Sequence, residues 1–391
     1  NPTEISSTQR TNMGQDISRS IEAHFQGVQD PRRQTLNQRH KFLDLLVIAV
    51  CGAICGANDW VAVATFGTAK EDWFRTFLEL PNGIPSHDTF TDVFSKLSPE
   101  QFQQCFISWV SSLATLFPGE VVSIDGKTLR HSYDAQDSRA SIHMVSAWAS
   151  QNSLVLGQLK TEEKSNEITA IPQLLEVLEL AGCLVTIDAM GCQKTIAAKI
   201  VKKEAEYLLA LKGNHPTLYR AVENYFHSVL TQALPTEDLD FLEIDERNHG
   251  RIEVRRCWVI SNLTWLPQHD EWKNLRSVIM IESERHVNGT VSLEQRYYLS
   301  SASGNAETFL NATRQHWSIE NSLHWVLDVA FREDDSRIRK GYGAENFAIL
   351  RHIALNLLKQ EQTTRIGIQN KRLKAGWDDR YLEKILEGMK R

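Results

Sequence analysis

Residues 183–213, CLVTIDAMGCQKTIAAKIVKKEAEYLLALKG, hold the pattern that decides the fold. The run LVTI is short and apolar and leads into Asp188, and YLLAL is a second run of the same kind before Lys212. Between them, CQKTIAAKIVKKEAE has the apolar spacing of an amphipathic helix. The stretch therefore predicts a strand, a helix and a second strand.

Three further β-rich runs precede this stretch, at residues 120–124, 142–149 and 153–160, and polar turns separate them. A helix is expected in EITAIPQLLEVLEL, residues 167–180. The resulting order βββαβαβ is that of a ribonuclease-H-like mixed sheet with helices on its faces. The predicted fold class is therefore α/β.

Length and composition bound the class of protein. The chain has 391 residues and a net charge of −6. This length favours several domains, and the charge gives no overall basic signature, so any contact with nucleic acid must use local patches of Lys and Arg. The opening residues lack the apolar core of a secretory signal, which favours an intracellular location.

The segment before the predicted sheet has helical spacing. Its most apolar part, residues 45–57, is too short to cross a bilayer, which takes about 20 residues. Cys51 and Cys55 have no second pair at zinc spacing, so core packing is favoured over a metal site. In PNGIPSHDTF, Ser86 is a good N-cap, and the helix after it belongs either to a helix-turn-helix or to an ordinary helical hairpin.

Two carboxylates follow predicted strands at corresponding places. Asp125 comes after VVSI and Asp188 after LVTI, and each is followed by a small residue. Each Asp either caps the next turn or faces a ligand at the rim of the sheet. Two such residues on neighbouring strands favour the rim site, because adjacent carboxylates repel one another unless a cation such as Mg²⁺ or Mn²⁺ lies between them.

A third carboxylate is expected from the helical segment HWSIENSLHW. At 100° per residue, Glu320, His324 and Asp328 share one face of a helix, and apolar residues occupy the other. The alternative is a solvated face of an amphipathic helix. Polar and aromatic neighbours of Glu320 favour a functional face: His316, Trp317 and Asn321.

Several segments resemble those of the ISAs-type, H-repeat-associated insertion-sequence transposases, which are DDE transposases with a β insertion in a ribonuclease-H-like fold. The resemblance spans about residues 36–360 and rests on VVSIDGKTLR, EKSNEITAIPQLLE, VTIDAMGCQK, LALKGN, HGRIEVRR and HWSIENSLHWVLDVAFREDDSR. It implies that Asp125, Asp188 and Glu320 are the catalytic and metal-binding triad. Related transposases often place Tyr, Arg and Lys around the catalytic Glu, where this chain has Thr313, His316 and Leu327.

The resemblance also implies a function. We expect a metal-dependent DNA transposase and endonuclease that binds terminal inverted repeats, cleaves phosphodiesters and transfers strands with two Mg²⁺ ions, for which Mn²⁺ can substitute. Its partners would be double-stranded DNA, at the transposon ends and at the target, and a second copy in a homodimer on DNA. We expect no membrane contact and a cytoplasmic, nucleoid-associated location. The alternatives are a catalytically silent DNA-binding descendant and a nuclease without end joining.

Each of the local basic residues alone is more typical of a solvated surface charge, but their placement beside the proposed site favours phosphate binding, so they and neighbouring polar and aromatic residues form the expected DNA surface. They are Lys127, Arg130, Lys160, Lys164, Lys212, His249, Arg251, Arg255, Arg314, His316, Trp317, Asn321 and Arg337. The helix expected at residues 344–359 is apolar nearly all round, so it is either buried core or a dimer contact.

The chain is thus expected to divide into six parts. They are a mobile N-terminal arm at 1–35, a helical DNA-binding domain at 36–117, the first part of the core at 118–232, an all-β insertion at 233–303, the second part of the core with its Glu-bearing helix at 304–360, and a polar C-terminal tail at 361–391.

Overall fold

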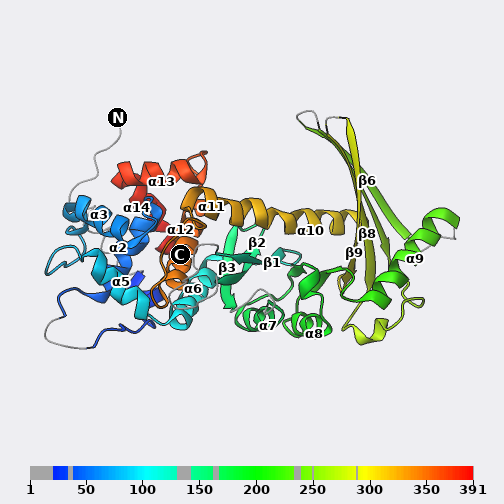
Figure 1. Cartoon of the computed structure of the whole chain (residues 1–391), viewed down its shortest axis with the longest axis horizontal. Coiled ribbons are helices and arrows are strands. Elements are labelled where there is room, and N and C mark those ends of the chain that lie inside the picture. Colours follow the sequence, from blue (N-terminus) through cyan, green and yellow to red (C-terminus); the bar gives the residue numbers. More distant parts are fainter. Residues whose placement is uncertain are drawn as a thin grey trace.

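A computed structural model describes residues 21–33, 38–129, 142–161, 167–232, 239–248, 251–287 and 289–390. Three regions follow one another along its longest axis: a helical block, a central sheet and a long β ribbon (Figure 1). None of the helices in the described ranges combines the length and the apolar character that a membrane crossing requires.

The central sheet confirms the ribonuclease-H-like fold. Its strand order is β3-β2-β1-β4-β5, in which β2 pairs antiparallel with β1 and β3, while β4 pairs parallel with β1 and β5. The helices α7 and α8 cover one face and α10 crosses the other (Figure 1). The elements are β1 (Val121–Thr128), β2 (His143–Ala149), β3 (Leu154–Thr161), α7 (Glu167–Val177), β4 (Leu184–Ile187), α8 (Lys194–Lys202) and β5 (Glu206–Leu211).

The β ribbon extends the same sheet. Strand β9 pairs antiparallel with β5, and the sheet continues through β8, β7 and β6, so the β insertion shares backbone hydrogen bonds with the core. The sequence pattern did not indicate strand β6 by itself, because its residues, LDFLEIDERN, include many acidic side chains. The elements are α9 (Pro216–Gln232), β6 (Leu239–Asn248), β7 (Arg251–Ile260), the 3₁₀ turn η4 (His269–Glu271), β8 (Ser277–Val287) and β9 (Thr290–Ser300).

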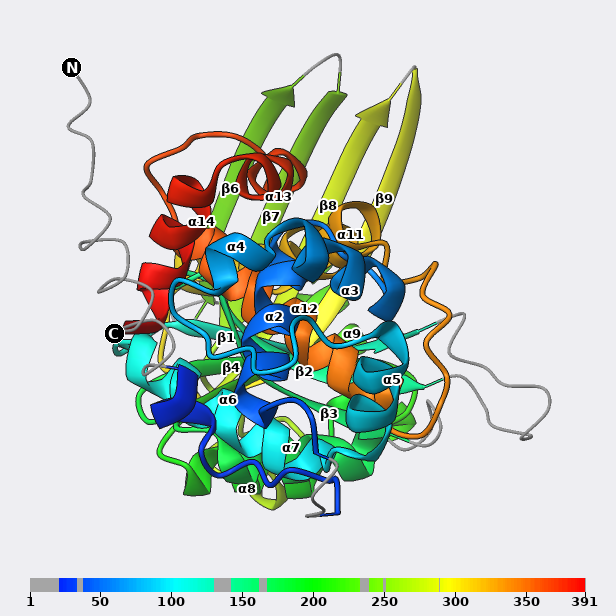
Figure 2. The same cartoon turned by 90° about the vertical axis from the view of Figure 1, so that its left-hand side faces the viewer.

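The helical block combines both ends of the chain. Helix α12 passes through its centre and packs against α2, α5 and α6 (Figure 2). Every residue of α12 from Gly343 to Leu358 is buried within this single chain, which favours core over a dimer contact. The elements are α2 (Phe42–Ile54), α3 (Trp60–Ala69), α4 (Glu71–Phe74), α5 (His87–Lys96), α6 (Pro99–Leu113), α12 (Gly343–Gln360), α13 (Ile368–Trp377), α14 (Asp379–Leu386) and the 3₁₀ turn η6 (Glu387–Lys390).

The structure differs from the expectation near both ends of the chain. The segment expected as a polar tail forms α13 and α14, where Tyr381, Leu382 and Ile385 are buried because they fall on one face of α14. In the part of the expected mobile arm that is described, Ile21 and Phe25 are buried. The helical block is therefore larger than the sequence boundaries of 36–117 indicate. The N-cap prediction at Ser86 is confirmed, since its side chain accepts a hydrogen bond from Thr89 N.

Candidate metal-dependent nuclease site

Asp125 and Asp188 lie side by side at one edge of the sheet. Ile124 of β1 pairs with Ile187 of the parallel strand β4, so the Asp that follows each occupies the same level. Asp188 also caps the 3₁₀ turn η3 (Ala189–Gly191), where its Oδ1 accepts from Met190 N at 3.0 Å and Gly191 N at 3.4 Å. Its Oδ2 takes part in neither bond. The capping role and the rim position therefore coexist in one residue.

Glu320 reaches this edge of the sheet from the helix that crosses one sheet face. Helix α10 (Ala306–Ile319) continues through one π-helical turn, η5 (Glu320–His324), into α11 (Trp325–Phe331). Glu320 and His324 still face each other across this π turn, as their expected shared face predicts. Asp328 instead contacts Lys127.

His324 lies between two of the carboxylates. Its Nδ1 is 3.5 Å from Glu320 Oε2 and 3.7 Å from Asp125 Oδ2. The potential ligand atoms of Asp125, Glu320 and His324 all lie within 4.8 Å of one another. His324 is buried, whereas the Glu320 side chain is 54% exposed. The site thus has a buried base and an exposed rim.

The electrostatics of these carboxylates favour a bound cation. Burial, opposed by His324 and reinforced by the carboxylates of Glu320 and Asp188, raises the pKa of Asp125 to about 6. Burial also raises the pKa of Asp188, and Glu167 adds to the effect. Contact with His324 lowers the pKa of Glu320. Two carboxylates, Asp125 and Asp188, whose ionisation burial opposes, would be stabilised by a hard divalent ion such as Mg²⁺ or Mn²⁺.

Lys127 fixes the Glu-bearing helix to β1. It follows Asp125 by two residues on the strand, and its Nζ donates to Asp328 and, at 2.9 Å, to Glu333 Oε2. The Lys127 side chain is only 12% exposed and that of Glu333 3%, and Arg351 lies 3.6 Å from the second oxygen of Glu333. The expected DNA contact of Lys127 stays a prediction, and its ammonium group already pairs with two carboxylates.

Comparison with known proteins agrees with this geometry. Residues 116–357 match the family described as the transposase DDE domain, and residues 22–110 match the domain associated with it. The chain belongs to this DDE transposase family. It is 43% identical over 363 residues to the "H repeat-associated putative transposase YhhI" of Escherichia coli K12, covering 91% of this chain and 95% of that protein. It is 42% identical over 359 residues to the "Putative transposase YncI" of Escherichia coli O157:H7, covering 90% and 91%.

The residues of this DDE transposase that surround Glu320 differ in exposure. His316 is partly buried and its Nδ1 lies 2.9 Å from Thr186 Oγ1, so it links α10 to β4. Its burial lowers its pKa to about 4. Trp317 is 48% exposed, with the Arg296 guanidinium 4.3 Å from its ring centre. Asn321 lines a hollow beside Glu320.

Several residues that we expected to bind DNA form ion pairs with carboxylates of the protein itself. Arg255 pairs with Glu246 and Glu253 at 2.5 and 2.7 Å, with its side chain 17% exposed, so its charge is already paired within the β ribbon. Arg314 pairs with Glu246 at 2.8 Å and keeps 41% exposure. Lys160 pairs with Glu345 at 2.7 Å and keeps 38%.

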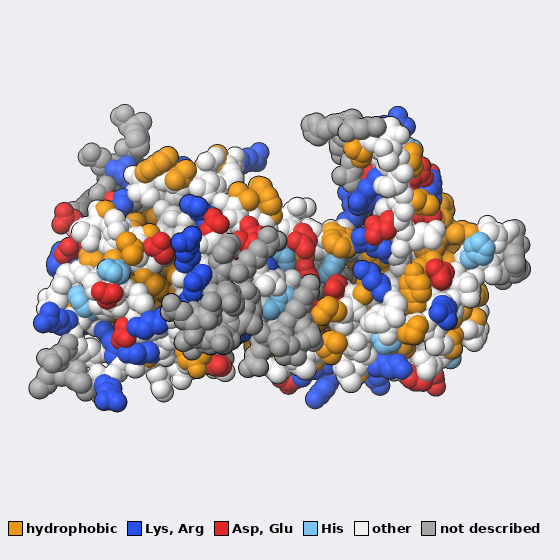
Figure 3. Space-filling view, viewed as in Figure 1, with side chains coloured by type: hydrophobic (Ala, Val, Ile, Leu, Met, Phe, Trp, Pro, Cys, Tyr) orange, Lys and Arg blue, Asp and Glu red, His pale blue; other side chains and the backbone are white. Residues whose placement is uncertain are grey.

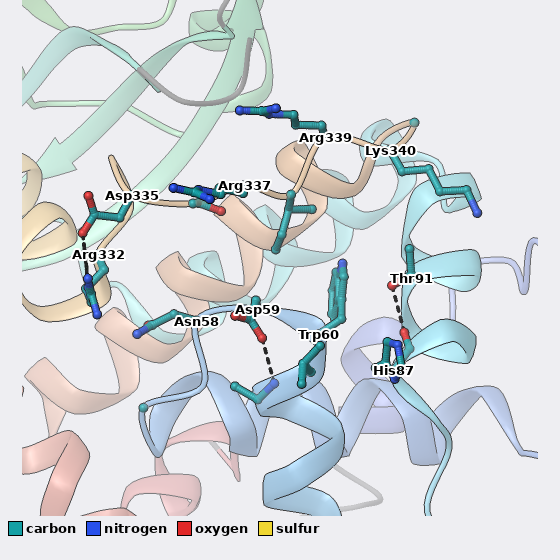
Figure 4. A pocket seen from close by; sticks show the side chains of 16 residues that line it. Asn58, Asp59, Trp60, His87, Thr91, Arg332, Asp335, Arg337, Arg339 and Lys340 are labelled. Carbon is teal, nitrogen blue, oxygen red and sulfur yellow. Dashed lines mark hydrogen bonds and ion pairs between the residues drawn. The ribbon is translucent and has the colours of Figure 1, made fainter. Parts of the chain in front are cut away.

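Two other expected contacts line hollows of the surface. Lys212 borders the hollow that includes Asp188 and Trp317. Arg337 projects into a hollow of about 850 Å³ between the helical block and the segment after α11 (Figure 4). Exposed basic residues of that segment gather there: Arg332, Arg337, Arg339 and Lys340. Arg130, Lys164, His249 and the side chain of Arg251 lie outside the described residues.

The space-filling view shows a broad recess between the helical block and the projecting β ribbon (Figure 3). Helix α10 runs beneath it (Figure 1). The sequence singled out the three carboxylates, but it did not indicate that His324 lies between two of them or that Lys127 pairs with Asp328 and Glu333. The spacing of Lys127 from Asp125 was the available signal, because residues i and i+2 of a strand share a face.

Proposed function

We propose that this chain is a metal-dependent DNA transposase that binds terminal inverted repeats, cleaves phosphodiester bonds and joins the freed ends to target DNA. The observation that carries the proposal is the clustering of Asp125, Glu320 and His324 within 4.8 Å, with Asp188 following the neighbouring parallel strand at the level of Asp125. Family membership supports the reaction class.

Asp125, Asp188 and Glu320 would hold the metal ions, which we propose to be two Mg²⁺ with Mn²⁺ as a substitute. When bound, they supply activation of the attacking hydroxyl and charge stabilisation during in-line displacement at phosphorus. The protein would orient the three carboxylates that hold these ions. Backbone N–H groups fix one oxygen each of Asp125 and Asp188, and Lys127 holds the helix that carries Glu320.

The recess above α10 is the proposed path of the DNA end. Trp317 and Asn321 flank Glu320 there, and Arg314 keeps an exposed guanidinium on the same helix. Arg337 and its basic neighbours would contact phosphates further along the duplex, on the side of the helical block. Because one chain carries one carboxylate set and two ends must be joined, we propose that a homodimer acts on DNA.

The test is incubation of the full chain with its matching transposon-end DNA and Mg²⁺, followed by strand-resolved product analysis. We expect cleavage at the transposon end and strand-transfer products when target DNA is present. The matched control is Asp188→Asn, which keeps the size of the side chain and a hydrogen-bond acceptor for the η3 turn while removing the charge. End binding without cleavage by the unaltered chain would identify a catalytically silent descendant instead.

A further inference from the structure

The proposed carboxylate triad does not account for the position of His324. It is the last residue of the π turn that begins at Glu320, and its side chain is 7% exposed. Its Nδ1 faces Glu320 Oε2 at 3.5 Å and Asp125 Oδ2 at 3.7 Å. A π turn within an α-helix is costly and is frequent at functional sites. This turn brings the imidazole to the two carboxylates.

These two distances are too long for ordinary hydrogen bonds. N–H···O bonds lie between about 2.7 and 3.2 Å, and an imidazolium bonded to a carboxylate lies at about 2.7–2.9 Å. Nε2 is buried without a hydrogen-bond partner among the described residues, so no partner there fixes which ring nitrogen carries the proton. Three polar atoms therefore point at one shared space without bonding to one another directly.

A divalent ion fits that space. Ligand atoms about 2.1 Å from a metal, at angles of about 90–120°, are about 3.0–3.6 Å apart. The distance from His324 Nδ1 to Glu320 lies at the upper end of this range and the distance to Asp125 lies just beyond it, so a small closure would complete the shell. Histidine is the commonest metal ligand in proteins, and it binds through a nitrogen of the neutral imidazole.

We propose that His324 Nδ1 is a direct metal ligand that completes a mixed oxygen and nitrogen site with Asp125 and Glu320. The inference rests on the proposed function, since it concerns the same ions. Mg²⁺ strongly prefers oxygen, whereas Mn²⁺ is a first-row transition metal and accepts an imidazole nitrogen more readily than Mg²⁺ does. His324 therefore biases this position toward Mn²⁺, with Asp188 left to serve the second ion.

The experiment uses the full chain, free of DNA, with Mn²⁺ alone as the probe. Pulsed electron paramagnetic resonance detects a ¹⁴N nucleus bound directly to Mn²⁺. We expect this coupling in the unaltered protein and its loss in His324→Phe, which keeps a ring of similar size but has no nitrogen. We also expect Mn²⁺ affinity to fall at least about tenfold and Mg²⁺ affinity to fall less.

Two further variants make the result specific. His324→Gln offers an amide oxygen, so it should bind Mn²⁺ without the nitrogen coupling and shift the preference toward Mg²⁺. His286→Phe is the control, because His286 lies on β8 of the ribbon, 38% exposed and paired with Glu284, and its loss should leave the coupling intact. Thermal unfolding of each metal-free variant checks the fold.

Mn²⁺ that binds with dependence on Asp125 and Glu320 but shows no ¹⁴N coupling would overturn this inference and leave the proposed function standing. Coupling that persists in His324→Phe would do the same. A protein that binds neither ion would overturn both.

Discussion

Replacing Lys127 with methionine should lower the free energy of unfolding by about 3–5 kcal/mol, the usual cost of removing one partner from a buried ion pair. The value is large because Lys127 and Glu333 are 12% and 3% exposed, so the Glu333 carboxylate would lose its closer cation without gaining water. Arg351, 3.6 Å from the other oxygen of Glu333, would compensate only in part.

The assay is urea unfolding of the full chain, followed by tryptophan fluorescence, with Lys160→Met as the matched control. Lys160 also pairs with a glutamate, but it is 38% exposed, so its loss should cost less than about 1 kcal/mol. Cleavage by Lys127→Met should fall because the Glu320 helix loses its anchor on β1. The salt dependence of end binding should not change, since the charge of Lys127 is already paired with two carboxylates.

Equal stability of Lys127→Met and Lys160→Met would refute the reasoning from burial. A fall of about 0.9 in the logarithmic salt slope of Lys127→Met would show that this lysine contacts a phosphate, as the sequence alone had led us to expect.

Four other results are expected. Alanine at Asp125, Asp188 or Glu320 should abolish cleavage while gel shifts show end binding retained; normal cleavage by Glu320→Ala would reassign the third ligand. Because folding raises the pKa of Asp125 to about 6 from an ordinary 3.8, the metal-free protein loses stability as pH rises between these values, so Asp125→Asn should be more stable above pH 6 by up to about 3 kcal/mol and equal below pH 4 in denaturant titrations. Arg337→Ala should reduce the salt slope of DNA binding by about 0.9, measured by fluorescence anisotropy, and an unchanged slope would remove it from the DNA path. Light scattering should find two chains on paired ends; one chain that still performs concerted insertion would exclude the dimer.

The strand-end carboxylates were predictable because they follow from local signals. An apolar run that stops at an acidic residue indicates a strand; β4 ends at that point, whereas β1 continues past Asp125 to Thr128. The runs before Asp125 and Asp188 gave this signal twice, and the parallel pairing of β1 with β4 then brings the two together. Glu320 was less certain from periodicity, and the resemblance supplied its role.

The features that the sequence did not indicate depend on contacts far apart along the chain. Asp328 pairs with Lys127, a residue about 200 positions earlier, and the helix that bears Glu320 contains a π turn, which no regular helical period predicts. The ion pairs of Arg255 depend on the register of β6 against β7, in which Glu246 lies opposite Glu253. A basic residue seen only in sequence cannot show whether its partner is a phosphate or a neighbouring carboxylate.

The helical block also sets a timing for synthesis. Helices α2 to α6 are complete by Leu113, but α12, which fills their centre, begins only at Gly343. At about 5–20 residues per second, the ribosome takes about 10–50 s to supply it. Until then the early helices lack the surface that buries them. The catalytic sheet can form sooner, yet its Glu320 helix joins that block through α11 and α13. A finished block, and with it a seated Glu320, therefore requires the last part of the chain, so a nascent or truncated copy should hold its carboxylates apart.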